Sequence, residues 1–194
     1  MRSLVFALAC AAAGSSLAAG INEFGLVNTC NSCHGVGGVS VGPSIPNLAG
    51  LDEGYLKRVM MEQKKGDRFS TIMGRLLKTY SDDEIAVLAR YFAAKEWKFI
   101  ETEKQSEVAD RGRGVYRKYC MNCHEKDGKE KNTEDMPRLS GQWPGYLKLE
   151  TLKYVDKSFT DRKPSEKMAE KISHLSDDEV AAAAHFLASR KGGQ

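Results

Sequence analysis

The sequence predicts an all-α protein made of two tandem repeats. Apolar residues recur at helical spacing near the end of each half, and no alternating strand pattern of useful length appears. Four segments also occur twice in the same order: residues 30–34 recur at 120–124, 46–50 at 137–141, 54–57 at 145–148, and 81–92 at 176–187. Because 194 residues suit either one ordinary domain or two small ones, the repeat decides for two.

Each repeat is expected to end in an amphipathic helix. Ser81 with Glu84, and Ser176 with Glu179, form the S-x-x-E pattern in which both side chains cap the start of a helix. Apolar residues follow at i, i+3, i+4 and i+7 in both copies, which predicts a buried face. A further helix is expected to lead into Cys120.

The organisation along the chain follows from composition. Residues 1–19 combine one basic residue, an apolar run and small residues near the end, which predicts a cleaved signal peptide and export. An alternative, in which Cys10 is a lipoprotein anchor, is disfavoured because Ala7 stands where the anchor motif has leucine. The polar segment 101–107 predicts a boundary between an N-terminal domain (20–100) and a C-terminal domain (101–194).

Charge and hydropathy exclude two classes of partner. The chain carries 29 basic and 26 acidic residues, spread over both repeats, so the clustered positive charge of a nucleic-acid-binding protein is missing. After the signal peptide no apolar run approaches the length of about 18 residues that a membrane span needs.

The motif C-x-x-C-H occurs in both repeats and is typical of covalent haem attachment. On a helical turn its three side chains share one face, so two thiols can form thioethers with the haem while the histidine reaches the iron. Zinc ligation and a redox dithiol are weaker interpretations, since the latter has no use for the histidine. The prediction is two haem c groups, held by Cys30 and Cys33 with His34 as iron ligand, and by Cys120 and Cys123 with His124.

The second axial ligand decides whether a haem carries electrons or activates a substrate. Met73 and Met168 each lie eight residues before a Ser-Asp-Asp-Glu segment, and no other methionine repeats in register. We therefore expect Met73 on the first iron and Met168 on the second. The alternatives, each less well supported, are Met60, Met61, Met121, Met136, His174 and His185.

A proximal histidine needs its second ring nitrogen held, commonly by a backbone carbonyl. The Gly42–Pro43 turn is expected to present that carbonyl to His34. The second repeat has Thr133 and Glu134 there and must achieve the same differently. The tyrosines of the two GYLK segments, Tyr55 and Tyr146, could reach haem propionates, although packing is the favoured role.

Two haems with filled axial positions predict electron transfer without catalysis on this chain. Three stretches carry a more specific resemblance: STIMGR (70–75), LSGQW (139–143) and RKP with the following Met168 (162–168). With the two C-x-x-C-H segments, they resemble the dihaem cytochrome subunit of flavocytochrome c sulfide dehydrogenase.

This resemblance implies two class I cytochrome c domains related by pseudo-twofold symmetry. It also implies a periplasmic complex with an FAD-containing subunit that oxidises sulfide, and a small soluble cytochrome c as the next acceptor. A dihaem respiratory shuttle to a terminal oxidase or reductase is the alternative. A dihaem enzyme, such as a peroxidase or thiosulfate dehydrogenase, would need an open, histidine or cysteine position on one iron.

Overall fold

The computed structural model describes residues 22–99, 106–125, 132–155 and 166–191, and all regular elements in these ranges are helices. The all-α prediction is therefore confirmed for them. The predicted signal peptide and the alternative anchor Cys10 lie outside the described residues, as does most of the predicted boundary segment. Among the described helices, none is long and apolar enough to cross a membrane.

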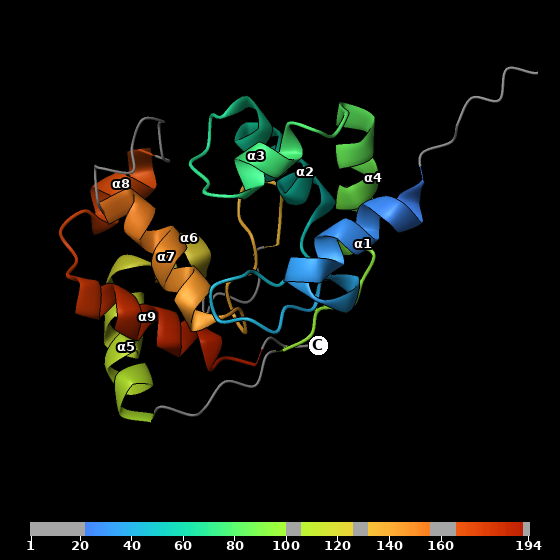
Figure 1. The fold of residues 1–194 in the computed structure, drawn as a ribbon. Coiled ribbons are helices and arrows are strands. Elements are labelled where there is room, and N and C mark those ends of the chain that lie inside the picture. Colours follow the sequence, from blue (N-terminus) through green and yellow to red (C-terminus); the bar gives the residue numbers. More distant parts are fainter. Residues whose placement is uncertain (1–21, 100–105, 126–131, 156–165, 192–194) are drawn as a thin grey trace, which may run out of the picture.

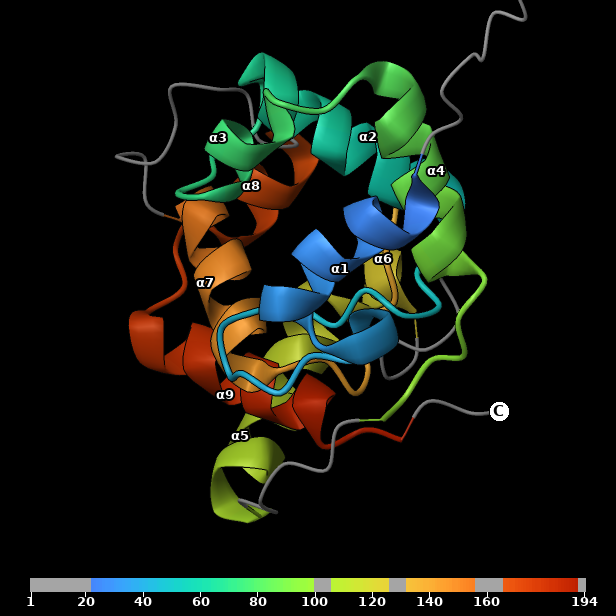
Figure 2. The same ribbon diagram turned by 45° about the vertical axis from the view of Figure 1, so that its right-hand side comes forward.

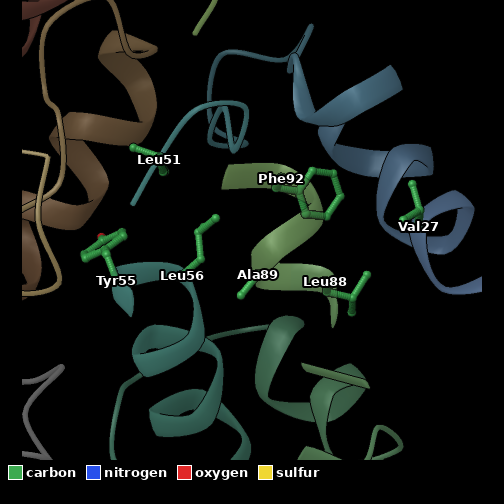
Figure 3. Close-up of a cluster of buried hydrophobic side chains, with 7 residues drawn as sticks. All are labelled: Val27, Leu51, Tyr55, Leu56, Leu88, Ala89 and Phe92. Carbon is green, nitrogen blue, oxygen red and sulfur yellow. The ribbon is translucent and has the colours of Figure 1, made fainter. Parts of the chain in front are cut away.

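The first repeat contains four α-helices and one short 3-10 helix. They are α1 (Glu23–His34), η1 (Val36–Gly38), α2 (Glu53–Lys65), α3 (Met73–Leu77) and α4 (Asp82–Ala93). Seven buried residues of α1, α2, α4 and the loop before α2 form one core cluster. Figure 3 shows Leu88, Ala89 and Phe92 of α4 between Val27 of α1 and Leu56 of α2.

The described part of the second repeat contains five helices, which are α5 (Ser106–Tyr119), α6 (Met121–His124), α7 (Pro144–Val155), α8 (Glu166–Ile172) and α9 (Asp177–Ala188). Figures 1 and 2 show α1–α4 on one side of the molecule and α5, α7, α8 and α9 on the other. The buried apolar residues described here form two clusters. One joins α5, α7 and α9, and a smaller one joins α8 to the start of α9, with partly buried side chains of α5 and α7 packed against it.

The repeated sequence produces repeated local structure. Both predicted capping boxes are present, at Ser81–Glu84 and Ser176–Glu179. Ahead of them, Gly50 donates its N–H to the Phe92 carbonyl (2.9 Å), and Gly141 donates to the Leu187 carbonyl (3.0 Å). Both glycines have positive φ (69° and 75°), a conformation that glycine adopts without a steric penalty. The last helix of each repeat is thus tied to the segment after its haem motif.

Two reciprocal contacts join the repeats. The glycine of the second GYLK segment, Gly145, lies against Pro43 of the first repeat, and the first GYLK glycine, Gly54, lies against Glu134 of the second. Positions 43 and 134 correspond at the same offset of 91 residues as the two GYLK segments. The two halves therefore exchange equivalent contacts, as expected for pseudo-twofold symmetry.

Candidate haem-binding sites

The first C-x-x-C-H motif occupies the last turn and a half of α1. Cys30 is half-buried, Cys33 is exposed and His34 is buried with 6% of its surface exposed. Gly35 ends the helix at φ 76°, and a side chain there would meet the Val39 carbonyl at 1.9 Å. The chain can therefore turn sharply after His34 and leave the cysteines on the helix face.

His34 is oriented by a backbone carbonyl, but not by the one predicted. Its Nδ1 lies 2.9 Å from the carbonyl oxygen of Pro46, whereas the Pro43 carbonyl accepts the N–H of Tyr146 from the other repeat (2.8 Å). The expected role of the Gly42–Pro43 turn is thus wrong, because that turn is used to join the repeats. With Nδ1 bonded to oxygen, Nε2 is the ring nitrogen left to bind iron.

The protonation state of His34 suits a metal ligand. Burial lowers its pKa, and the hydrogen bond to Pro46 opposes this only in part. The imidazole is therefore neutral at neutral pH, as a ligand must be. Burial also raises the pKa of the Cys30 and Cys120 thiols to about 11. A redox dithiol has a lowered thiol pKa instead, so the raised pKa of these two thiols argues against disulfide exchange.

The second C-x-x-C-H motif lies at a break between two helices. α5 ends at Tyr119, and Met121–His124 form a separate short helix, α6. The Tyr116 hydroxyl donates to the carbonyl oxygens of His124 (3.1 Å) and Glu125 (2.6 Å), which fixes the end of the motif. Tyr116 lies on the helix expected to lead into Cys120, and the role of its hydroxyl was not predicted. The first repeat has Leu26 at the corresponding position, and leucine has no hydroxyl to make such a bond.

Three predicted site residues of the second repeat meet in one cavity. Cys120, His124 and Met168 line it together with a wall of apolar side chains, among them Leu139, Leu147, Ile172, Leu175, Val180 and Leu187. The cavity lies between the two core clusters of this repeat, because its walls include members of both. An imidazole and a methionine thioether that can bind iron, with a thiol that can form a covalent link, around an apolar space suit a haem c.

Met73 is the first residue of α3 and is half-buried. α3 packs against α2, and the Gly74 N–H donates to the Ser70 hydroxyl (2.6 Å), which fixes the start of the helix. The neighbouring apolar side chains Ile72 and Leu76 are exposed. The pairing of Met73 with His34 stays a prediction from the repeat.

The alternative ligands have other surroundings. Met60 packs against the core cluster of the first repeat and Met121 against the larger cluster of the second. The His174 ring lies edge-on to the Tyr119 ring, with centroids 4.9 Å apart. His185 lies half-buried on α9.

The tyrosines of the GYLK segments lie where the repeats meet. Burial raises the pKa of Tyr55 to about 12 and that of Tyr146 well above its usual range, and the same cross-repeat ion pair, Arg68 with Glu150 at 3.1 Å, acts on both. Trp143, next to this segment, donates its indole N–H to the Ser40 carbonyl (3.1 Å). These side chains have structural roles between the repeats.

Comparison with known proteins supports the haem interpretation. A family model for the cytochrome c oxidase, cbb3-type, subunit III, matches residues 107–187. Cytochrome c4 of Pseudomonas aeruginosa is 29% identical over 193 residues, which cover 96% of this chain and 92% of that protein. The crystal structure of reduced cytochrome c4 from Pseudomonas stutzeri superposes with a TM-score of 0.75 at 24% identity, over 86% of this chain and 95% of that one.

The chain is a dihaem c-type cytochrome. Its fold is that of two tandem class I cytochrome c domains, and its four motif cysteines fit two covalent haem c groups. The predicted resemblance to a sulfide dehydrogenase subunit holds over a shorter stretch. The cytochrome subunit of sulfide dehydrogenase from Chlorobaculum tepidum is 39% identical over 64 residues, which are 33% of this chain and 57% of that protein.

Proposed function

We propose that this cytochrome carries electrons through two haems that each have histidine and methionine as axial ligands. His34 and Met73 would ligate the first iron, and His124 and Met168 the second. The observation that carries this proposal is the cavity in which Met168 faces the same space as Cys120 and His124. The register of the repeat extends the assignment to Met73.

A haem iron with both axial positions filled exchanges single electrons and has no site for a substrate. The protein's own residues then have three tasks. The cysteines fix each haem, the apolar walls exclude water, and the axial side chains set the potential. The chain is an electron-transfer protein, and any catalytic step belongs to a partner.

Methionine ligation can be tested with one variant in each repeat. Met73→Leu and Met168→Leu should each remove about half of the methionine–iron charge-transfer absorption of the oxidised protein, because leucine has no sulfur to bind iron. Met60→Leu is the matched control, since Met60 packs in the core and should leave the band intact. A full band in either ligand variant would exclude that methionine.

For the partner, we propose an FAD-containing subunit that oxidises sulfide in the periplasm. The stretches STIMGR, LSGQW and RKP with Met168 support it, as does the similarity to the Chlorobaculum tepidum subunit. A flavin releases two electrons that haems accept one at a time, so two haems suit such a donor. The electrons would pass on to a small soluble cytochrome c.

A second candidate is a dihaem shuttle that works without a stable partner. The similarity to cytochrome c4 over nearly the whole chain favours it. Both candidates agree on export and on the same two haems, and they differ in what delivers the electrons and what accepts them.

Isolation of the native protein separates the two candidates. Co-purification of a flavin-containing polypeptide in equal amount, with haem reduction on addition of sulfide, is the expected result. A monomer that a quinol-oxidising complex reduces, and that a sulfide-oxidising flavoprotein does not, would establish the shuttle instead.

A further inference from the structure

One peptide group connects the first haem motif to the other repeat. This group joins Pro46 to Asn47. Its carbonyl oxygen accepts the hydrogen bond from His34 Nδ1 at 2.9 Å, and its N–H donates to Oε1 of Gln142 at 2.8 Å. A carbonyl can only accept, so Nδ1 of His34 carries the proton. The chain of bonds therefore runs in one direction, from His34 through the peptide to Gln142.

The orientation of the Gln142 amide is fixed by its other contacts. Nε2 donates to the Asn47 carbonyl (3.0 Å), while Oε1 also accepts from the Trp143 N–H (3.1 Å). A reversed amide would set donor against donor and acceptor against acceptor. Asn47 is fully buried and Gln142 is 2% exposed, so water does not compete for these bonds.

Hydrogen bonds on both sides of a peptide strengthen each other. When Oε1 of Gln142 accepts a hydrogen bond from the Asn47 N–H, it polarises the peptide group. The Pro46 carbonyl oxygen then becomes more negative and accepts a stronger hydrogen bond from His34. A histidine whose N–H is held more strongly is a better electron donor to its metal, and this favours the oxidised iron.

We propose that Gln142, a residue of the second repeat, is a positioning residue that lowers the reduction potential of the first haem. It acts through the Pro46–Asn47 peptide on His34, and it also holds the segment that carries that peptide. The inference rests on the proposed role of His34 as an iron ligand. It adds a specific coupling between the domains, in which one repeat adjusts the electron affinity of the other.

The first repeat has no counterpart of Gln142 that could act in the same way on the second haem. At the offset of 91 residues, the position of Gln142 is occupied in the first repeat by Leu51, which lies in the apolar core and has no acceptor. Asn47 corresponds to Arg138. Two haems with the same predicted ligands thus receive different surroundings, and we expect their potentials to differ in part for this reason.

The test is Gln142→Met in the holoprotein, because methionine keeps the volume and loses the amide acceptor. Each haem is followed separately during a redox titration by NMR of the ¹⁵N-labelled protein, with the amides of Val36 and Gly37 reporting the first haem and that of Asn122 the second. The potential of the first haem should rise. The equilibrium constant for its one-electron reduction should increase by about threefold to tenfold, and a tenfold increase corresponds to 59 mV. The second haem should keep its potential.

Asn132→Leu is the matched control. Asn132 makes the same kind of reciprocal contact across the repeats, because it accepts from the Asp52 N–H (3.0 Å) and donates to the Gly50 carbonyl (2.9 Å). It does not touch the Pro46–Asn47 peptide bond. This variant loosens the contact between repeats by a similar amount, and it should leave both potentials unchanged.

Gln142→Leu serves if Gln142→Met does not fold. Leucine also removes the amide acceptor from the Asn47 N–H, so the first potential should again rise. An unchanged first potential in whichever variant folds, or an equal shift of both haems, would overturn the proposal. Such results leave the proposed ligands standing, because the charge-transfer band of the methionine variants tests those independently.

Discussion

The two repeats share a sequence pattern but build their cores differently. In the first repeat one continuous cluster holds α1, α2 and α4 together. In the second repeat α8 belongs to a small separate cluster, and the cavity with Cys120, His124 and Met168 lies between it and the larger one. A repeated motif therefore does not imply equal dependence on the group it binds, since the second haem would lie between two clusters of the described residues.

The helices that approach each motif differ as well. α1 runs unbroken through the first C-x-x-C-H segment, whereas α5 ends before the second and crosses α9 very closely. At that crossing, a side chain on Gly112 would lie 1.9 Å from the Ala182 carbonyl. A close helix crossing thus holds the second repeat together, while one continuous apolar cluster holds the first.

Removal of the second haem should have the largest effect. The double variant Cys120→Ala/Cys123→Ala cannot attach the second haem, so no haem packs between the two apolar clusters of that repeat. We expect the free energy of unfolding of the second repeat to fall by at least about 4 kcal/mol. The double variant Cys30→Ala/Cys33→Ala should leave more of the first repeat protected. Amide hydrogen exchange measures both, and equal loss of protection in the two repeats would contradict the comparison.

The close helix crossing gives the next largest effect. Gly112→Ala places a methyl group against the backbone of α9, so the helices must separate, at a cost of about 2–3 kcal/mol. Gly114 lies on the same helix with open space around its Cβ position, and Gly114→Ala should stabilise by about 0.5–1 kcal/mol. Thermal unfolding measures the pair, and a shift of the same sign in both variants would show that the crossing is not tight.

The contacts between the repeats should show the smallest difference. Gly145→Ala meets the Pro43 carbonyl at 2.5 Å, whereas Gly54→Ala meets the exposed Glu134 side chain at 3.1 Å. Because backbone yields less readily than a side chain, we expect Gly145→Ala to cost about 1–2 kcal/mol and Gly54→Ala to be near neutral. Exchange of the Tyr146 amide, which bonds to Pro43, locates the effect. Similar melting temperatures for the two variants would mean that the interface is symmetric.

Much of the fold and part of the site could be predicted because the signals are local. Helix caps such as Ser81 with Glu84 depend on residues three apart, and both formed as predicted. The haem motifs depend on side chains within one helical turn. The second-repeat cavity also agrees with Met168 as ligand, a position found by counting back from a repeated helix start.

The supports of the site could not be predicted in the same way. Pro43 and Pro46 both follow His34 at a suitable distance in sequence, and only folding shows that Pro46 meets the ring while Pro43 bonds to Tyr146. The double hydrogen bond of Tyr116 at the second motif was missed because its partners are backbone carbonyls, which carry no signature in the sequence.

Spacing within short segments is enough to predict the all-α repeat, the two covalent haems and the register of the candidate ligands. How the halves are joined, and which carbonyl holds His34, depends on contacts that form only in the folded chain. The Asn47–Gln142 contact spans 95 residues along the chain. Such a contact forms when two separately built surfaces meet, and their fit depends on the packing of every element between them.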